Sequence, residues 1–217
     1  MASELTAWGH SCIRLERDGM RLVIDPGRLS APDALTGAAG VLVTHEHSDH
    51  VDMSMLRQSL DVDPDLQVWG PPSVIIALSD GTAGDERLHG VTAGARIEAV
   101  GFDVEVLGEW HAVVYPTIPR VVNVAYLIDG ALLHPGDSFT VPADRVVGTL
   151  LAPVAGPWMK IVEAVDFIHE IAPRTVVPIH DATLSPAGKA LVDRLVHQLC
   201  PDVEYHRLPA ADALPVL

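Results

Sequence analysis

Short apolar runs separated by turn residues fill the first third of the chain, a pattern typical of β-strands. Asp18-Gly19 stands between two of these runs and predicts a hairpin. After Asp52 the apolar residues follow a helical spacing, and Pro71-Pro72 opens a second stretch that we interpret as a helix. The predicted strands of this part are 12–15, 21–24, 41–44 and 67–69, with a helix that includes residues 53–60.

The middle of the chain is richer in strands. Apolar runs predict strands at 96–100, 102–110, 123–128 and 131–134, and Asp129-Gly130 predicts a hairpin between the last two. Beyond them, a helical period covers 159–171, a continuous apolar run predicts a buried strand at 175–179, and a last helix is expected at 187–199.

The predicted elements follow one another along the 217 residues in groups of strands separated by helices. We find no repeat at a fixed period and no linker rich in Pro, Gly or Ser. We therefore predict one layered domain that spans residues 1–217, a common length for a single folding unit.

The charge of the chain restricts its partners. There are 29 acidic and 14 basic residues, which gives a net charge of −15 with neutral histidines. A surface of this sign repels a polyanion, and the few lysines and arginines form no cluster that follows a phosphate backbone. We expect a small-molecule substrate and no nucleic acid, and we leave homo-oligomer formation open.

Cysteines and apolar stretches indicate the compartment. Cys12 and Cys200 are too few for a disulfide framework, so we expect a reducing cytoplasm. The first ten residues lack a basic segment followed by an apolar run, so no secretory signal is expected. The longest apolar stretch, 146–159, is interrupted by Pro153 and Pro157 and is shorter than the roughly 20 residues that span a bilayer. We expect no contact with a membrane.

The densest chemistry lies directly after the predicted strand 41–44. Residues 45–50 read His-Glu-His-Ser-Asp-His. In an extended segment His45 and His47 point to the same side and can bind one metal ion, while the following turn directs Asp49 and His50 toward a neighbouring ion. A polar surface loop is the less favoured alternative.

One loop cannot complete two coordination spheres, so further ligands are required at other strand ends. His111, Asp137 and His180 each follow a predicted strand. Each is a weak signal alone, because a single histidine after a strand is usually a surface or capping residue. Together with the loop they form a set.

These residues, in this order, resemble the metallo-β-lactamase-fold hydrolase superfamily. Gly9-His10-Ser11, Ile24-Asp25-Pro26 and Pro135-Gly136-Asp137 are similar to segments of its small single-domain members, the ascorbate-6-phosphate lactonase-like group. The resemblance implies an α/β fold, an αββα sandwich with metal ions at one edge of its two sheets.

The resemblance also implies a ligand set for two divalent ions. His45, His47 and His111 would hold one ion, Asp49, His50 and His180 the other, with Asp137 between them. Imidazole and carboxylate without thiolate suit Zn²⁺, our first expectation, as well as Mn²⁺ or Fe²⁺.

The chemistry expected of this site is hydrolysis. Two ions about 3.5 to 4 Å apart can share one water and present hydroxide to an ester, lactone or phosphoester. We expect Asp49 to be catalytic as well as a ligand, and His10 to donate a proton to the leaving group; an ordinary loop histidine is the alternative for His10. Ser11 and Cys12 are nucleophile candidates that we assign to packing.

Other residues carry weaker signals. Asp25 could orient the histidine loop or be a turn residue, and Asp181 could orient a ligand or cap a strand. Arg120, in a segment that interrupts two strands, is a candidate counter-charge for an anionic substrate. We do not expect His134 to be a ligand. Aromatic residues could form the wall of a pocket or part of the core: Trp8, Trp110, Trp158 and Tyr115. The other histidines are expected to be solvated: His89, His169, His197 and His206.

Three alternative functions remain open on the same fold. One is an iron-dependent oxidoreductase, which usually needs a fused flavin domain or fewer ligands at the second ion. Another is a metal-binding domain without catalysis, which the complete ligand set disfavours. The third is a phosphodiesterase or nuclease, which the charge of the chain disfavours.

Overall fold

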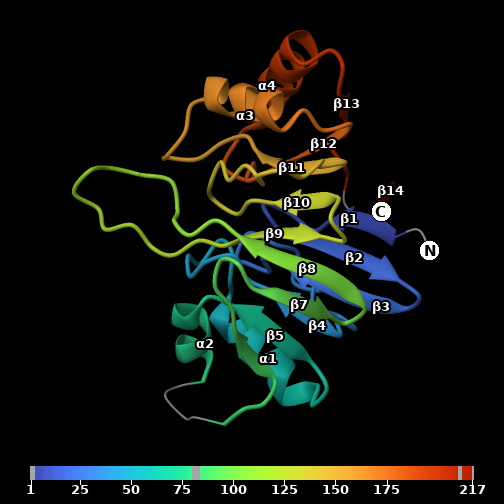
Figure 1. Ribbon diagram of the computed structural model, residues 1–217, viewed down its shortest axis with the longest axis vertical. Helices are drawn as coiled ribbons and strands as arrows, with labels where there is room; N and C mark the ends of the chain where they lie inside the picture. Colours follow the sequence, from blue (N-terminus) through green and yellow to red (C-terminus); the bar gives the residue numbers. More distant parts are fainter. Residues whose placement is uncertain (1–2, 80–83, 210–211, 217) are drawn as a thin grey trace.

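The computed structural model describes residues 3–79, 84–209 and 212–216 and arranges them in four layers, helix, sheet, sheet and helix (Figure 1). Each sheet has seven strands. The first runs in the order β14 (Ala213–Val216), β1 (Ser3–Ala7), β2 (Ile13–Arg17), β3 (Met20–Ile24), β4 (Gly40–Leu42), β5 (Gln67–Gly70) and β6 (Leu88–Gly90). The second runs β13 (Glu204–Tyr205), β12 (Thr175–Ile179), β11 (Thr149–Pro153), β10 (Leu132–His134), β9 (Ala125–Ile128), β8 (Phe102–Leu107) and β7 (Arg96–Ala99).

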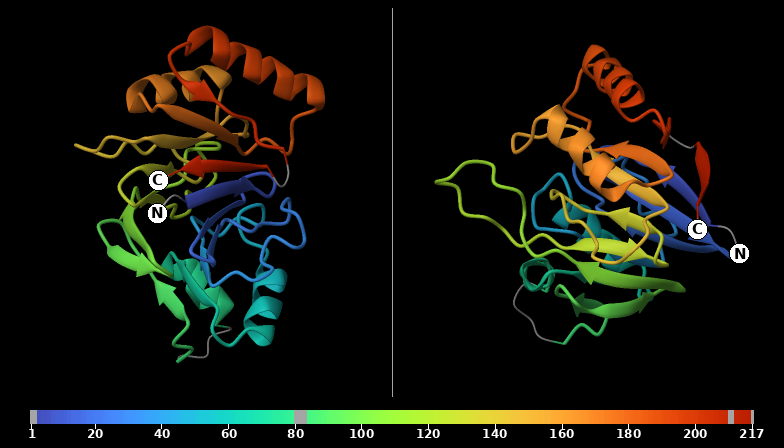
Figure 2. Two further views of the ribbon diagram at one scale, coloured as in Figure 1. Left: turned by 90° about the vertical axis from the view of Figure 1, so that its right-hand side faces the viewer. Right: turned by 45° about the horizontal axis from the view of Figure 1, so that its top comes forward.

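Two helices cover the outer side of each sheet (Figures 1 and 2). The first sheet packs against α1 (Met53–Val62) and α2 (Pro72–Leu78), and the second against α3 (Ile161–Ile171) and α4 (Pro186–Leu199). The start of α1 is fixed by Asp52, whose carboxylate accepts hydrogen bonds from the first backbone N–H groups of the helix. Ser185 caps α4 in the same way and is followed by proline, which suits the first helical position.

Burial on both faces explains why the central strands are continuously apolar. Successive side chains of a strand point to opposite faces. In β12, Val177 and Ile179 therefore belong to the core between the sheets, while Val176 packs on the side of α3 and α4. The four layers thus enclose three apolar cores, which confirms the αββα sandwich that the family resemblance implies.

Strand direction brings distant segments to one end of the sandwich. Strands β3 to β6 run parallel to one another, as do β10 to β13. Two hydrogen bonds connect the sheets below this end: the hydroxyl of Tyr126 donates to the carbonyl of Val43 at 2.7 Å, and the N–H of Val124 donates to the carbonyl of Thr44 at 2.9 Å. Segments that follow β3, β4, β10 and β12 can therefore meet.

Both hairpins predicted from Asp-Gly pairs are confirmed. The strands on either side of Asp18-Gly19 and of Asp129-Gly130 pair antiparallel. The four residues of these turns have positive φ angles, as turns of this kind require.

The predicted strand 102–110 is wrong at its end, since β8 stops at Leu107. The chain turns at Gly108, which has φ +71°, a conformation that glycine adopts readily; a Cβ at this position would lie 2.8 Å from Oγ1 of Thr140, so a side chain would be crowded there. Sequence patterns also missed β1, β6, β11, β13 and β14. Of these, β11 lies inside the apolar stretch 146–159 and is buried throughout. Among the described residues, every helix is too short or too polar to cross a lipid bilayer.

Candidate metal centre

The histidine loop 44–50 leaves the end of β4 and is held by Asp25, which follows β3. Thr44 donates to Asp25 from its backbone N–H and from its hydroxyl, both at 2.7 Å. Nδ1 of His50 lies 2.6 Å from Oδ2 of the same carboxylate. Asp25 is fully buried, so these bonds replace its lost hydration. The loop is therefore tied to the neighbouring parallel strand through one side chain.

Glycine allows a second close contact below the loop. A Cβ on Gly27 would lie 1.9 Å from the carbonyl oxygen of Asp49, so no other residue fits between the two segments. The N–H of Arg28 donates to the carbonyl of Ser48 at 2.8 Å. The backbone of 25–28 thus supports the turn that carries Asp49 and His50.

A first group of ligand atoms comes from His45, His47, His111 and Asp137. One ligand atom from each lies within 4.8 Å of every other. Nε2 of His45 is 3.1 Å from Nδ1 of His47, and Nε2 of His111 is 3.2 Å from Oδ2 of Asp137. Nδ1 of His111 faces the carbonyl of Ala112, which leaves Nε2 as the nitrogen that can bind a metal ion.

A second group consists of His10, Asp49, His50 and His180, whose ligand atoms also lie within 4.8 Å of one another. Oδ2 of Asp49 is 3.2 Å from Nε2 of His10 and 3.6 Å from Nε2 of His180. His180 follows β12 in a left-handed conformation with φ 59°, and its N–H donates to the carbonyl of His10.

Asp137 lies between the two groups. Its Oδ1 approaches Nε2 of His50 to 3.0 Å, and its Oδ2 lies 3.1 Å from Nε2 of His180 and 3.2 Å from Nε2 of His111. The structure therefore brings together all seven ligands predicted from the sequence, with His10 beside them.

The donor set fits divalent cations. Nε2 of His50, Oδ1 of Asp137 and both ring nitrogens of His180 are buried and make no hydrogen bond to other described residues. Such buried polar atoms are costly unless something binds them. Imidazole nitrogens and carboxylate oxygens that converge without hydrogen-bond geometry are the arrangement that a metal ion satisfies.

Burial and neighbouring charges shift the pKa values of the site residues in different directions. Burial lowers the pKa of His45 well below its ordinary value and also lowers the pKa of His47. Burial would lower the pKa of His50 too, but the carboxylates of Asp137 and Asp25 raise it well above its ordinary value. The pKa of Asp137 is held well below the ordinary range by His50, His111 and His180, against the effect of burial.

The tautomer of His10 can be assigned from its contacts. Its Nδ1 accepts a hydrogen bond from the backbone N–H of Ala182 at 3.3 Å. The ring proton is therefore on Nε2, which donates to Oδ2 of Asp49. Burial lowers the pKa of His10, which keeps the ring neutral. His10 acts as a hydrogen-bond donor to Asp49 in this arrangement.

Sequence patterns did not identify two buried residues that form hydrogen bonds with Asp137. Asn123 accepts a hydrogen bond from the N–H of Asp137 at 2.9 Å and donates to the carbonyl of Pro135 at 2.9 Å. The indole N–H of Trp158 donates to Oδ2 of Asp137 at 3.0 Å. Neither contact has a local sequence signal, because each joins Asp137 to a distant segment.

Several weaker candidates lie beside the centre or away from it. The carboxylate of Asp181 pairs with Lys189 and Arg207. Nε of Arg120 donates to the carbonyl of His111 at 2.8 Å. His134 is buried and lies 3.0 Å from the carbonyl of Ser11 through Nε2, outside both ligand groups.

Among the described residues, the other candidates form no hydrogen bond or ring contact with the predicted metal ligands. Cys12 is buried in the core under α1, and burial raises the pKa of its thiol to about 12, so it is a poor nucleophile. Trp110 and Tyr115 are exposed, and Trp8 packs against Arg14. His89 is not simply solvated as predicted, because it stacks on Trp69.

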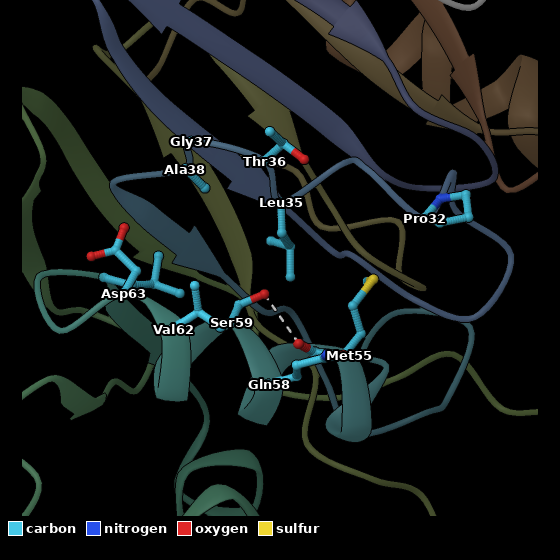
Figure 3. A pocket seen from close by; sticks show the side chains of 11 residues that line it. Pro32, Leu35, Thr36, Gly37, Ala38, Met55, Gln58, Ser59, Val62 and Asp63 are labelled. Carbon is cyan, nitrogen blue, oxygen red and sulfur yellow. Dashed lines mark hydrogen bonds between the residues drawn. The ribbon is translucent and has the colours of Figure 1, made fainter.

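One cavity lies beside the metal centre, and a second lies away from it. One of about 310 Å³ is lined by His10, Asp181, Lys189 and Arg207 among others. Another of about 380 Å³ lies between α1 and the segment 32–38, with Leu35, Met55 and Asp63 in its wall (Figure 3). The second cavity contains none of the predicted ligands.

The four-layer sandwich with histidines and aspartates at one end of its sheets defines the metallo-β-lactamase fold. Residues 4–180 match the family model described as the beta-lactamase superfamily domain. The chain belongs to this superfamily.

Individual relatives agree with this assignment. Protein Rv0786c of Mycobacterium tuberculosis is 36% identical, over 87% of this chain and 88% of its own length. A protein of Methanopyrus kandleri named UPF0173 metal-dependent hydrolase MK1542 is 25% identical, over 92% and 94%. Among solved structures, the metallo hydrolase Igni18 of Ignicoccus hospitalis has a similar fold, with a TM-score of 0.76, 19% identity, and coverage of 100% of this chain and 99% of that one.

Proposed function

We propose that this protein is a metal-dependent hydrolase that holds two divalent ions and acts on an ester, lactone or phosphoester bond of a small molecule. His45, His47 and His111 would hold one ion, Asp49, His50 and His180 the other, with Asp137 between them. The observation that carries the proposal is the position of Asp137, whose carboxylate lies 3.0 to 3.2 Å from imidazoles of both groups: Oδ1 faces His50, and Oδ2 faces His180 and His111.

Bound ions would supply Lewis acidity, lowering the pKa of a water and offsetting negative charge on the reacting group. The protein supplies the rest of the chemistry from fixed positions. Asp25 and Asn123 hold the histidine loop and Asp137 in place through the hydrogen bonds described above. A site built on strand ends in this way needs little rearrangement when a substrate binds.

His10 is the group beside the centre that can move a proton, and Asp49 accepts its hydrogen bond. The Nε2–H of His10 lies against Oδ2 of Asp49, and a proton given to a leaving group would come from the protonated imidazole, which then returns to its neutral form. Partial burial would raise the pKa of Asp49, but the hydrogen bond from His10 and the charge of His50 lower it to about 2. Asp49 is therefore ionised near neutral pH and ready to bind a cation.

The ligand chemistry favours zinc. Five histidines and two aspartates form the proposed set, with no thiolate, and neutral imidazole is a good ligand for zinc. Manganese and iron are the alternatives that the same donors allow. A small-molecule substrate is favoured over nucleic acid because the chain carries a net charge of −15.

Metal content paired with a substrate panel tests the proposal. The purified protein is reconstituted with Zn²⁺, Mn²⁺ or Fe²⁺, its metal is counted by elemental analysis, and ester, lactone, phosphodiester and thioester substrates are assayed. We expect about two ions per chain and hydrolysis of at least one substrate class, and His45→Ala should lose one ion together with the hydrolysis.

His197→Ala is the matched control, because His197 is exposed on α4 and outside both ligand groups. Fewer than two ions per chain, or unchanged metal content in Asp137→Ala, would contradict the two-ion model. Two ions with no turnover of any substrate would favour a metal-binding domain instead.

A further inference from the structure

Trp158 lies in the segment between β11 and α3 and is almost completely buried against the metal centre, with 7% of its surface exposed. Its ring makes edge contacts with His111 of the first ligand group and His180 of the second, with centroids 5.9 Å apart in both cases. Its N–H donates to Asp137, the residue between the groups. One side chain thus contacts both halves of the centre and the carboxylate between them.

The indole N–H differs in kind from the imidazoles around Asp137. An imidazole nitrogen that binds a cation has no proton left to donate, whereas an indole nitrogen is a donor in every state of the site. The hydrogen bond from Trp158 to Oδ2 of Asp137 can therefore persist when ions are bound. It restricts rotation of the carboxylate, whose Oδ1 is directed at His50.

The backbone around Trp158 is shaped for this contact. A Cβ on Gly156 would lie 2.7 Å from Nε1 and 3.0 Å from Cε2 of the indole. Gly156 is not among the residues with positive φ, so the backbone itself would accept alanine. Because Phe139 packs against the indole, with centroids 5.3 Å apart, the ring has little room to move away.

We infer that Trp158 is a positioning residue that fixes the rotation of Asp137, with Oδ1 facing His50 and Oδ2 facing both His111 and His180, and that Gly156 is required to keep the indole there. This inference rests on the proposed two-ion function. Loss of a hydrogen bond that orients a metal ligand typically weakens metal affinity about 10- to 100-fold. We expect an effect of this size on at least one of the two ions.

The test compares Trp158→Phe, which keeps an aromatic ring but removes the N–H, with Gly156→Ala, which keeps the N–H but displaces it. Metal-free protein is titrated with Zn²⁺ against a chromophoric chelator to obtain both dissociation constants, and the Co²⁺ form is examined by visible absorption. Both variants should bind at least one ion 10-fold or more weakly and should show a changed Co²⁺ spectrum.

Trp69→Phe is the matched control, since Trp69 has the same 7% exposure but belongs to the core between the sheets. It should leave both dissociation constants and the Co²⁺ spectrum unchanged. Thermal unfolding of the metal-free forms separates loss of folding from loss of affinity, and Gly156→Ala keeps the test available if Trp158→Phe does not fold.

The possible failures can be told apart. If the unaltered protein binds fewer than two ions, the proposed function fails. If it binds two, and Trp158→Phe and Gly156→Ala both keep dissociation constants within twofold and the same spectrum, only the role of Trp158 is overturned. The role of Trp158 is also overturned if Trp69→Phe weakens metal binding as much as Trp158→Phe does.

Discussion

Oδ2 of Asp25 lies 2.6 Å from Nδ1 of His50, although the two residues are separated by 25 positions in the chain. The contact fixes which ring nitrogen of His50 faces the metal centre, because Nδ1 is occupied and Nε2 points toward Asp137. Asp25 therefore connects the strand β3 to the chemistry that follows β4.

Removal of this carboxylate should weaken both folding and metal binding. In Asp25→Ala, the buried N–H and hydroxyl of Thr44 lose their acceptor, which costs about 1–3 kcal/mol for each unsatisfied group. Metal affinity should fall about 10- to 100-fold because His50 is no longer oriented. Urea unfolding and a metal titration measure the two effects, with the exposed Asp65→Asn as control. Unchanged affinity in a folded Asp25→Ala protein would contradict the orienting role.

Removal of metal should lower the stability of the protein. Nε2 of His50 and both ring nitrogens of His180 are buried and make no hydrogen bond to other described residues, so a bound ion stabilises the folded state selectively. Free ion at 100 times its dissociation constant adds about 2.7 kcal/mol per site. Thermal unfolding with added Zn²⁺ or with a chelator should show a higher Tm in Zn²⁺. An identical Tm under both conditions would argue against tight binding.

Substitution of His10 should slow the reaction while leaving metal in place. Asparagine is the suitable replacement, because His10 has φ 53° and asparagine tolerates this region. Loss of a general acid typically reduces kcat about 10²- to 10⁴-fold. Metal content and kcat of His10→Asn are measured on the same sample. Loss of one ion would instead identify His10 as a ligand, and unchanged kcat would exclude both roles.

Arg120 should distinguish substrates by charge. Its Nε is bound to the carbonyl of His111, which holds an exposed guanidinium beside a proposed metal ligand. We expect Arg120→Ala to raise KM for an anionic ester and to leave KM for a neutral ester of similar size unchanged. Arg96→Ala, whose side chain is 70% exposed on another part of the surface, is the control. Equal losses on both esters would refute the assignment.

The stability of the protein should depend on the ionisation of Asp193. Partial burial would raise the pKa of this carboxyl, but hydrogen bonds from Arg207 and Tyr205 lower it. A lowered folded pKa contributes stability above the ordinary carboxyl value, and this stability disappears as the pH falls through the lowered value. The loss in Asp193→Asn should be about 1 kcal/mol or less at pH 7, since the pair is partly exposed.

Urea unfolding at neutral and acidic pH measures this dependence. The difference between the protein and Asp193→Asn should shrink at low pH, where the protonated carboxyl resembles the amide. Asp65→Asn should show no such trend. A difference that stays constant with pH would mean that the charge of Asp193 does not stabilise the fold.

Much of the site could be predicted because its donors have local or positional signals. The spacing of His45, His47, Asp49 and His50 needs only an extended segment followed by a turn. His111, Asp137 and His180 were found because each follows an apolar run. The ends of elements were less predictable: the chain turns at Gly108, where φ is +71° and a side chain would crowd Thr140, and no periodicity reveals this.

The sequence alone determined the layered α/β fold, the two Asp-Gly hairpins and the set of metal-binding residue types, because these depend on local conformation and on the burial of apolar runs. Only the tertiary structure decided which atoms face one another. The tautomer of His10 depends on Ala182, and the orientation of Asp137 depends on Asn123 and Trp158. These contacts join segments that are far apart in the chain, so their geometry exists only once both sheets have packed together.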